Sequence, residues 1–151
     1  MTYIGVDPGR SGAMAIIETR EGEEDFIVTT AFDKDDYIVL LQRAKRDGTK
    51  VICALERVNA MPGQGVTSMF TFGENFGWIQ GILDAYHIPY ELVRPQKWKK
   101  EFGLTGEKLQ SVAVCKHLFP EVSLLRTDRS RKDDDGLAEA LLLCEYARRH
   151  L

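Results

Sequence analysis

The hydrophobic positions along the chain follow two periods, which separate predicted strands from predicted helices. Short apolar runs at residues 2–6, 13–17 and 26–31 are divided first by a Pro-Gly turn and then by an acidic turn. They predict three antiparallel strands in series. The run at 50–55 is apolar without alternation, which favours a strand that is buried on both faces. A short fifth strand is predicted at 89–93.

Apolar residues at helical spacing predict four helices, at residues 34–46, 68–86, 105–118 and 134–150. The basic segment 94–100, which follows the fifth strand, is predicted as a turn. The resulting order is β-β-β-α-β-α-β-α-α. It predicts a single α/β domain over residues 1–151, with a mixed five-stranded sheet flanked by helices. In that sheet, three antiparallel strands are followed by two parallel strands.

Composition and charge narrow the classes of function. The 151 residues are 44% hydrophobic and 28% charged, enough for one buried core. The formal net charge of −3 argues against a non-specific nucleic-acid coat protein, which is usually basic. The three cysteines are widely spaced and form no zinc pattern. No run approaches the roughly 20 apolar residues that cross a bilayer, so we expect a soluble, cytoplasmic protein with no membrane partner.

Four acidic residues lie where the predicted elements would bring them together. Asp7 ends the first strand and Glu56 ends the fourth, while Asp135 and Glu139 lie one turn apart on one face of the last helix. Carboxylate oxygens suit Mg²⁺, for which Mn²⁺ can substitute. Two such ions, roughly 3.5–4 Å apart, would bind the attacking water and the leaving oxygen of a phosphodiester. The pattern therefore predicts a nuclease-type metal site.

Each of these acids also has a structural interpretation. Asp7 lies in an Asp-Pro-Gly turn, where aspartate is common. Acids at the start of the last helix cap it and interact favourably with its dipole. We assign capping to Asp133 or Asp134 and keep Asp134 as a reserve ligand. The joint placement of the four acids, rather than any single one, favours the metal site.

Basic residues gather close to these acids, chiefly in two clusters, before the third and the last predicted helices. The candidate phosphate-binding residues are Arg10, Arg57, Arg94, Lys97, Lys99, Lys100, Arg129, Arg131 and Lys132. The competing interpretation is an ordinary charged surface. Trp98, inside the first cluster, is interpreted as a packing anchor. Met61, Phe70 and Phe72 are interpreted as core residues or, alternatively, as side chains that stack on unpaired bases.

Three motifs resemble those of the RuvC-type Holliday junction resolvases. They are IGVDPG at residues 4–9, ALE at 54–56, and DGLAEALL at 135–142, the last being similar to the terminal helix of phage-type members. The resemblance implies a ribonuclease H-like fold, with two Mg²⁺ ions bound by these acids. It implies a homodimer that nicks two strands of a four-way DNA junction symmetrically. It also implies a catalytic role for Lys108. The family commonly has Asp where this chain has Glu139.

Other functions stay open at this point. A sugar-kinase or actin-like ATPase also begins with a strand, an aspartate and glycines, but it needs two such domains and a second phosphate loop. The chain has neither, so we expect no nucleotide cofactor. A ribonuclease H acting on RNA–DNA hybrids would use the same metal chemistry. A junction-binding protein without catalytic activity is the third alternative.

The predicted helix at 68–86 supports a homodimer. Gly73, Gly77 and Gly81 are spaced four residues apart, so they line one face of that helix. A face without side chains lets another backbone approach closely. A two-fold dimer would present two sites to a two-fold junction.

Overall fold

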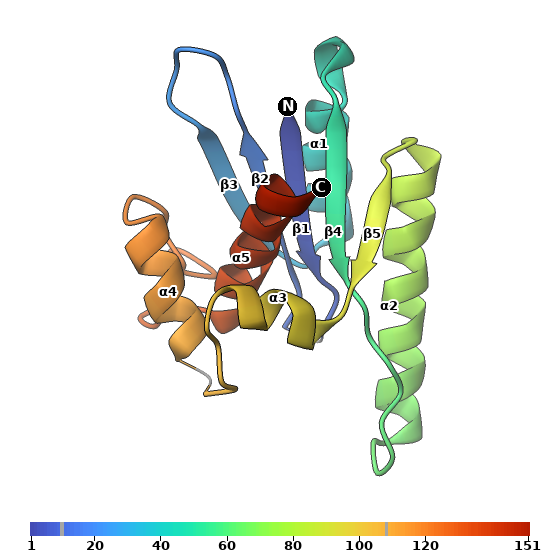
Figure 1. Cartoon of the computed structure of the whole chain (residues 1–151). Helices are drawn as coiled ribbons and strands as arrows, with labels where there is room; N and C mark the ends of the chain where they lie inside the picture. The colour runs from blue at the N-terminus through green and yellow to red at the C-terminus, as the bar shows by residue number, and fades with distance from the viewer. Residues whose placement is uncertain (10, 108) are drawn as a thin grey trace.

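Five strands form one mixed sheet, in the spatial order β3-β2-β1-β4-β5 (Figure 1). The structure, a computed structural model, describes residues 1–9, 11–107 and 109–151. The strands are β1 (Thr2–Asp7), β2 (Ala13–Glu18), β3 (Phe26–Ala31), β4 (Val51–Glu56) and β5 (Tyr90–Val93). β1 and β3 both pair antiparallel with β2, whereas β1 pairs parallel with β4 and β4 with β5. The predicted sheet is confirmed.

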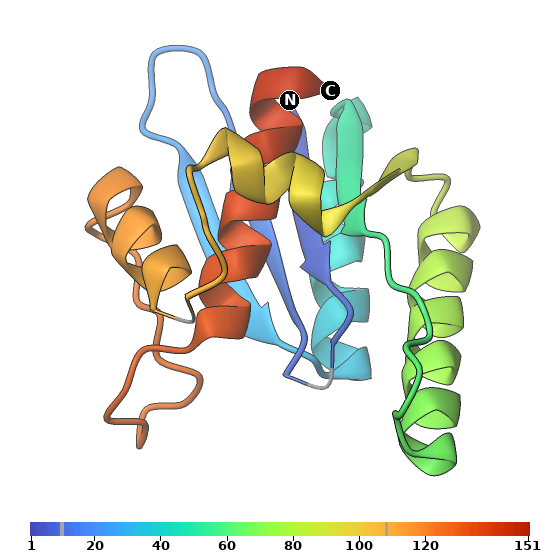
Figure 2. The ribbon, with the colours of Figure 1, turned by 60° about the horizontal axis from the view of Figure 1, so that its bottom comes forward.

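Helices cover both faces of this sheet. They are α1 (Lys34–Ala44), α2 (Val66–Ala85), α3 (Pro95–Glu101), α4 (Gln110–Leu118) and α5 (Asp135–His150), with a 3-10 turn at Arg46–Gly48. Ile4 and Val6 of β1 pack in a core cluster with α1 and α2, while Ala13 and Ala15 of β2 pack in a second cluster with α3, α4 and α5. Figure 2 shows α3 crossing over α5, with α4 beside it.

The last helix lies directly on the sheet because glycine at two positions leaves room for it. A Cβ atom added at Gly5 of β1 would lie 2.2 Å from the carbonyl oxygen of Ala140 and 2.2 Å from the amide nitrogen of Cys144. A Cβ added at Gly136 would lie 2.2 Å from the carbonyl oxygen of Ser11. Any side chain at either position would push α5 away. The first turns of α5 therefore lie beside the end of β1.

One predicted element and one predicted helix boundary are wrong. The segment 94–100, predicted as a turn, forms helix α3. Pro95 is at the start of this helix, where its fixed φ is favourable, and Trp98 is fully buried. Helix α4 begins at Gln110 rather than at residue 105. Gly106 has a φ of +104°, which is outside the right-handed helical region.

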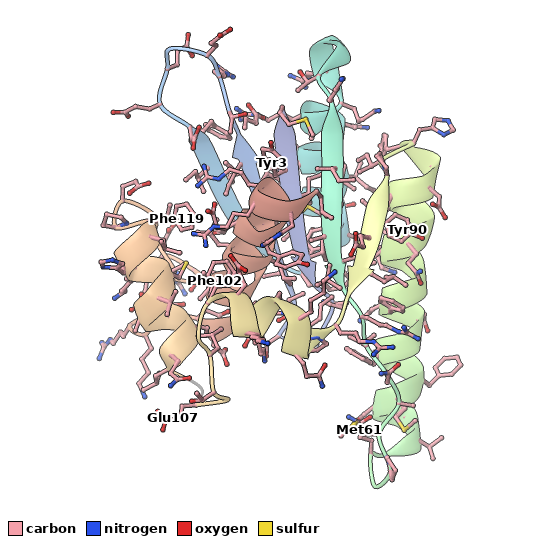
Figure 3. The ribbon with its side chains drawn as sticks, viewed as in Figure 1. Tyr3, Met61, Tyr90, Phe102, Glu107 and Phe119 are labelled. Atoms are coloured by element: carbon pink, nitrogen blue, oxygen red, sulfur yellow. The ribbon has the colours of Figure 1, made fainter. Side chains whose placement is uncertain are left out.

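The first half of α2 and the loop before it extend beyond the ends of the strands (Figures 1 and 3). Phe70 is 73% exposed and Met61 is 61% exposed, so the core-packing interpretation is wrong for both. Phe72 is partly buried and lines a groove of about 630 Å³ on this segment. Although α2 has 20 residues, no helix in the described part of the chain has the length and apolar character needed to span a bilayer.

Candidate active site

Asp7 and Glu56 are neighbours because the strands that bear them are parallel and adjacent. Val6 of β1 is in register with Leu55 of β4. The next residue in each strand is therefore an acid, and both acids end their strands at the same edge of the sheet. Side chains alternate along a strand, so Asp7 shares the face of Gly5, which is the face that α5 covers.

Within residues 1–9, 11–107 and 109–151, few groups balance the charge of the buried Asp7 carboxylate. Its side chain accepts one hydrogen bond, from the backbone N–H of Gly9 at 3.0 Å, and the residue is 9% exposed. Burial and the charge of Glu56 raise the pKa of Asp7 to about 7, and the Gly9 N–H offsets only part of this rise. Glu139 raises this pKa further and Lys99 lowers it. The described groups of the site therefore carry an excess of negative charge, which a bound cation would offset.

Helix α3 adds two side chains to these acids. The indole nitrogen Nε1 of Trp98 donates a hydrogen bond to Oε2 of Glu56 at 2.7 Å. The adjacent Lys99 forms an ion pair with Glu139 of α5, with 3.5 Å between Nζ and Oε1. Burial raises the pKa of Glu56, the Trp98 hydrogen bond opposes this, and Glu139 raises it again. Three elements that are far apart in sequence thus meet in one acidic cluster, defined here as Asp7, Glu56 and Glu139.

Asp135 lies apart from this cluster. It is exposed in the first turn of α5, and its Oδ1 accepts a hydrogen bond from the N–H of Gly136 at 3.1 Å. Glu139, and not Asp135, is among the main causes of the raised pKa of Asp7. The structure therefore brings three of the four predicted acids together and leaves Asp135 at the margin of the site.

Asp134 is the N-cap of α5, as one of the two capping assignments predicted. Its side chain accepts a hydrogen bond from the N–H of Leu137 at 3.0 Å. Arg126 binds both of its carboxylate oxygens, at 2.6 and 2.8 Å. Burial would raise the pKa of Asp134, but Arg126 and the Leu137 N–H outweigh burial and hold that pKa below its usual value. Both oxygens are engaged, which argues against Asp134 as a reserve metal ligand.

Arg126 also connects the two loops that surround the acidic cluster. Its Nη2 donates a hydrogen bond to the carbonyl oxygen of Ser11 at 2.7 Å, across 115 residues of sequence. Ser11 belongs to the turn after Asp7, and Asp134 precedes the helix that bears Glu139. Arg126 therefore holds the end of β1 against the start of α5. No local pattern in the sequence indicated this contact of Arg126.

The candidate phosphate-binding residues fall into three groups. Lys97 pairs with Glu91 at 3.3 Å, and Lys99 pairs with Glu139, so these two lysines are already partnered. Lys97 is exposed, and so, in the described part of the chain, are six candidates that have no ion pair there: Arg57, Arg94, Lys100, Arg129, Arg131 and Lys132. Arg10 lies outside the described residues, as does the predicted catalytic Lys108. Of these six, Arg94 and Lys100 belong to the α3 segment, Arg57 directly follows β4, and the other three lie in the loop before α5.

The acidic cluster fits Mg²⁺ by the chemistry of its donors. As the side chains stand, no group of three or more His, Cys, Asp or Glu residues within the described ranges converges closely enough to hold a metal ion. Mg²⁺ does not require such a group, because it retains waters and is commonly bound by one or two carboxylates together with substrate phosphates. Asp7 and Glu56 provide two adjacent carboxylates. A bound cation would offset the cost of burying the negative charge of Asp7.

No protein-family model matches this sequence, and no curated protein sequence matches it. Solved structures do match. RuvC of Thermus thermophilus in complex with a Holliday junction substrate has a TM-score of 0.63, with 13% identity over 99% of this chain and 97% of that one. Another T. thermophilus RuvC structure has a TM-score of 0.60, with 14% identity over 99% and 96% of the two chains.

The fold is RuvC-like. The sheet order and the helices on both faces agree with the ribonuclease H-like fold that the sequence motifs implied. At this identity the likeness establishes the fold alone. The similarity of the last helix to phage-type members finds no support in these matches.

Proposed function

We propose that this chain is a Mg²⁺-dependent endonuclease that resolves four-way DNA junctions by paired symmetric nicks. The observation that carries the proposal is the buried Asp7 beside Glu56, at the ends of two parallel strands in a RuvC-like fold. One of the matching RuvC structures has a Holliday junction bound as its substrate. Exposed basic residues in the α3 segment and in the loop before α5 supply charge for phosphates.

Some residues of the site would bind cations, and others would position the elements that bear them. Asp7 and Glu56 would hold divalent cations, with Glu139 or Asp135 completing the set on the α5 side. Bound Mg²⁺ supplies activation of the attacking water and stabilisation of the leaving oxygen in phosphodiester hydrolysis, with Mn²⁺ as a substitute. Lys99 balances part of the negative charge of the cluster before DNA arrives. Arg126 keeps β1 and α5 at a constant separation.

Helix α2 supports a homodimer. At Gly73, Gly77 and Gly81 an added Cβ would have no described atom within 4 Å, so that face is free for a second copy. Val66, at the start of the same helix, is 86% exposed. Burying such a surface in a two-fold dimer would present two acidic clusters to the two-fold junction. Met61 and Phe70, which project beside it, are suited to stack on unpaired bases at the junction centre.

Cleavage of defined substrates tests the proposed function. A four-way junction, a fork, a linear duplex and an RNA–DNA hybrid, each end-labelled, are incubated with the protein and Mg²⁺, with EDTA as the control. We expect paired nicks at symmetric positions in the junction and no nicks in EDTA. Preferential cleavage of the hybrid would instead indicate a ribonuclease H. Tight junction binding with no cleavage in Mg²⁺ or Mn²⁺ would indicate a binding protein.

The oligomeric state is tested separately by sedimentation velocity at micromolar concentration, with and without junction DNA. A dimer is expected in at least the DNA-bound sample, and Gly77→Glu should shift the protein to a monomer because a charged side chain would occupy the glycine face. A wild-type protein that sediments only as a monomer in both samples would contradict the dimer.

A further inference from the structure

Trp98 makes an unusual contact for a fully buried side chain. Its residue exposure is 0%, and its only hydrogen-bond donor, the indole N–H, points at a carboxylate of the acidic cluster. A buried tryptophan normally finds a partner for this donor. Here the partner is Glu56, 42 residues earlier in the chain, at 2.7 Å. The short distance is that of a charge-assisted hydrogen bond.

The indole is held in place by the core around it. Trp98 belongs to the cluster that joins α3, α4 and α5 to the sheet, together with Val93 and Val112. The residue that follows it, Lys99, pairs with Glu139. Two consecutive residues of α3 thus engage two members of the acidic cluster. Because the ring is packed on all sides, its N–H is a rigid donor rather than a mobile one.

A rigid donor changes what Glu56 can do. A glutamate side chain has several rotatable bonds, and ordering it costs conformational entropy. The Trp98 hydrogen bond occupies Oε2 and thereby selects one orientation of the carboxylate, leaving Oε1 for another partner. Hydrogen bonds of this kind orient metal-binding carboxylates in many proteins.

We propose that Trp98 is a positioning residue for Glu56, whose indole N–H fixes one carboxylate oxygen so that the other remains available to a divalent cation shared with Asp7. This inference rests on the proposed function for its catalytic consequence, but not for its effect on cation binding. The competing view is that Trp98 is only a packing side chain whose hydrogen bond has no further effect.

The chain offers a matched control because it has two tryptophans. Trp78 lies on the other face of the sheet, in an edge-to-face arrangement with Phe32 at 6.1 Å and close to Tyr37 at 6.4 Å between ring centroids. Trp78→Phe and Trp98→Phe remove the same atoms from two separate parts of the core. Only Trp98→Phe removes a contact with the acidic cluster.

Cation affinity distinguishes the two views without DNA. Calorimetric titration of Mn²⁺ into each protein measures the dissociation constant. For Trp98→Phe we expect a value about 10–100-fold larger than for wild type. Trp78→Phe should bind Mn²⁺ as wild type does. In nicking assays, the Mg²⁺ concentration for half-maximal rate should rise by a similar factor in Trp98→Phe only. Equal Mn²⁺ affinity in the two folded variants would overturn the proposal.

A second measurement covers the case in which Trp98→Phe does not fold. In the Trp78→Phe protein the single indole N–H signal in a ¹⁵N-correlated NMR spectrum belongs to Trp98. We expect Mg²⁺ to move this signal and Glu56→Ala to abolish that response. A signal that ignores Mg²⁺ in the intact site would overturn the proposal. If the signal responds to Mg²⁺ only when Glu56 is present, but the protein cleaves no DNA, the positioning role of Trp98 is supported and the proposed nuclease function is rejected.

Discussion

Acidic side chains gather near both ends of α5, but the charges of the two groups are balanced differently. At the C-terminal end, Glu145 is 4% exposed and pairs with Arg148 at 2.6 Å and with Arg149 at 2.7 Å. The same arginines continue to Asp25 at 2.6 Å and to Glu101 at 3.2 Å. Every acid there has a basic partner within the chain.

At the N-terminal end, Asp7, Glu56 and Glu139 share one described lysine, Lys99. A buried charge without a partner costs several kcal/mol, and folding alone gives no reason to retain it. The balanced cluster is therefore explained by stability, because it ties α5 to α3 and to the loop between β2 and β3. For the described residues of the second cluster, the proposed divalent cation would supply the missing positive charge.

The largest expected effect is on DNA nicking, which should depend on the acidic cluster and not on Glu145. Asp7→Asn and Glu56→Gln should each reduce junction nicking by roughly 10³-fold or more, because several kcal/mol of metal-assisted stabilisation is lost. Junction binding should stay equal or become tighter, since each change removes a negative charge that faces DNA. Single-turnover nicking and gel-shift titration measure the two quantities. Full nicking by Asp7→Asn would reject the site.

Glu145→Gln should lower the stability of the protein and leave nicking unchanged. It removes one anionic partner from Arg148 and one from Arg149, which keep their ion pairs with Asp25 and Glu101. Both arginines are about one-third exposed, so we expect a loss of about 1–3 kcal/mol in the free energy of unfolding. Urea denaturation measures that loss. Nicking per folded molecule should remain at the wild-type level, and a catalytic defect as large as that of Asp7→Asn would erase the distinction between the two ends of α5.

Removing charge from the acidic cluster should stabilise the protein. Asn at position 7 keeps the acceptor for the Gly9 N–H and relieves repulsion from Glu56, so Asp7→Asn should raise the free energy of unfolding by about 1–2 kcal/mol in EDTA. Mg²⁺ should raise the melting temperature of the wild type and not that of Asp7→Asn. Thermal unfolding by circular dichroism tests both statements. Destabilisation of the Asn variant in EDTA would mean that the cluster is already balanced.

The smallest expected effect concerns DNA affinity. Lys100→Ala should weaken junction binding and reduce the slope of log affinity against log salt by about 1, because one fewer phosphate is neutralised. Arg20→Ala is the matched control, since Arg20 is exposed and pairs with Glu18 and Glu23, away from the acidic cluster. Fluorescence anisotropy over a series of salt concentrations measures both. Identical slopes for the two variants would place the DNA elsewhere.

The sheet was predictable from sequence because its signals are local. Asp7 and Glu56 end apolar runs, and parallel pairing of those runs places the two acids side by side without further information. Capping by Asp134 was likewise readable as an acid before a helical pattern. Helix α3 was missed because its charge resembles a turn, although Pro95 and a buried Trp98 are consistent with a helix start.

The contacts that complete the site were not predictable in the same way. Trp98 bonds to Glu56 across 42 residues, and Arg126 bonds to Ser11 across 115 residues. Such contacts depend on how α3 and α5 pack against the sheet. The spacing of hydrophobic residues along the sequence does not determine that packing. A signal did exist for Trp98, since a buried indole N–H needs an acceptor and Glu56 was already a candidate. The separation of Asp135 from Asp7 depends on where the first turn of α5 lies relative to the end of β1, which the helical period alone does not give.

The location of bound cations tests the central claim most directly. Crystals of the protein soaked in Mn²⁺ would give anomalous difference density wherever the ion binds. The account predicts density in contact with the carboxylates of Asp7 and Glu56, and none at Glu145, whose carboxylate is already paired with two arginines. Density at the Glu145 end, or none at Asp7 and Glu56 with junction DNA present, would contradict it.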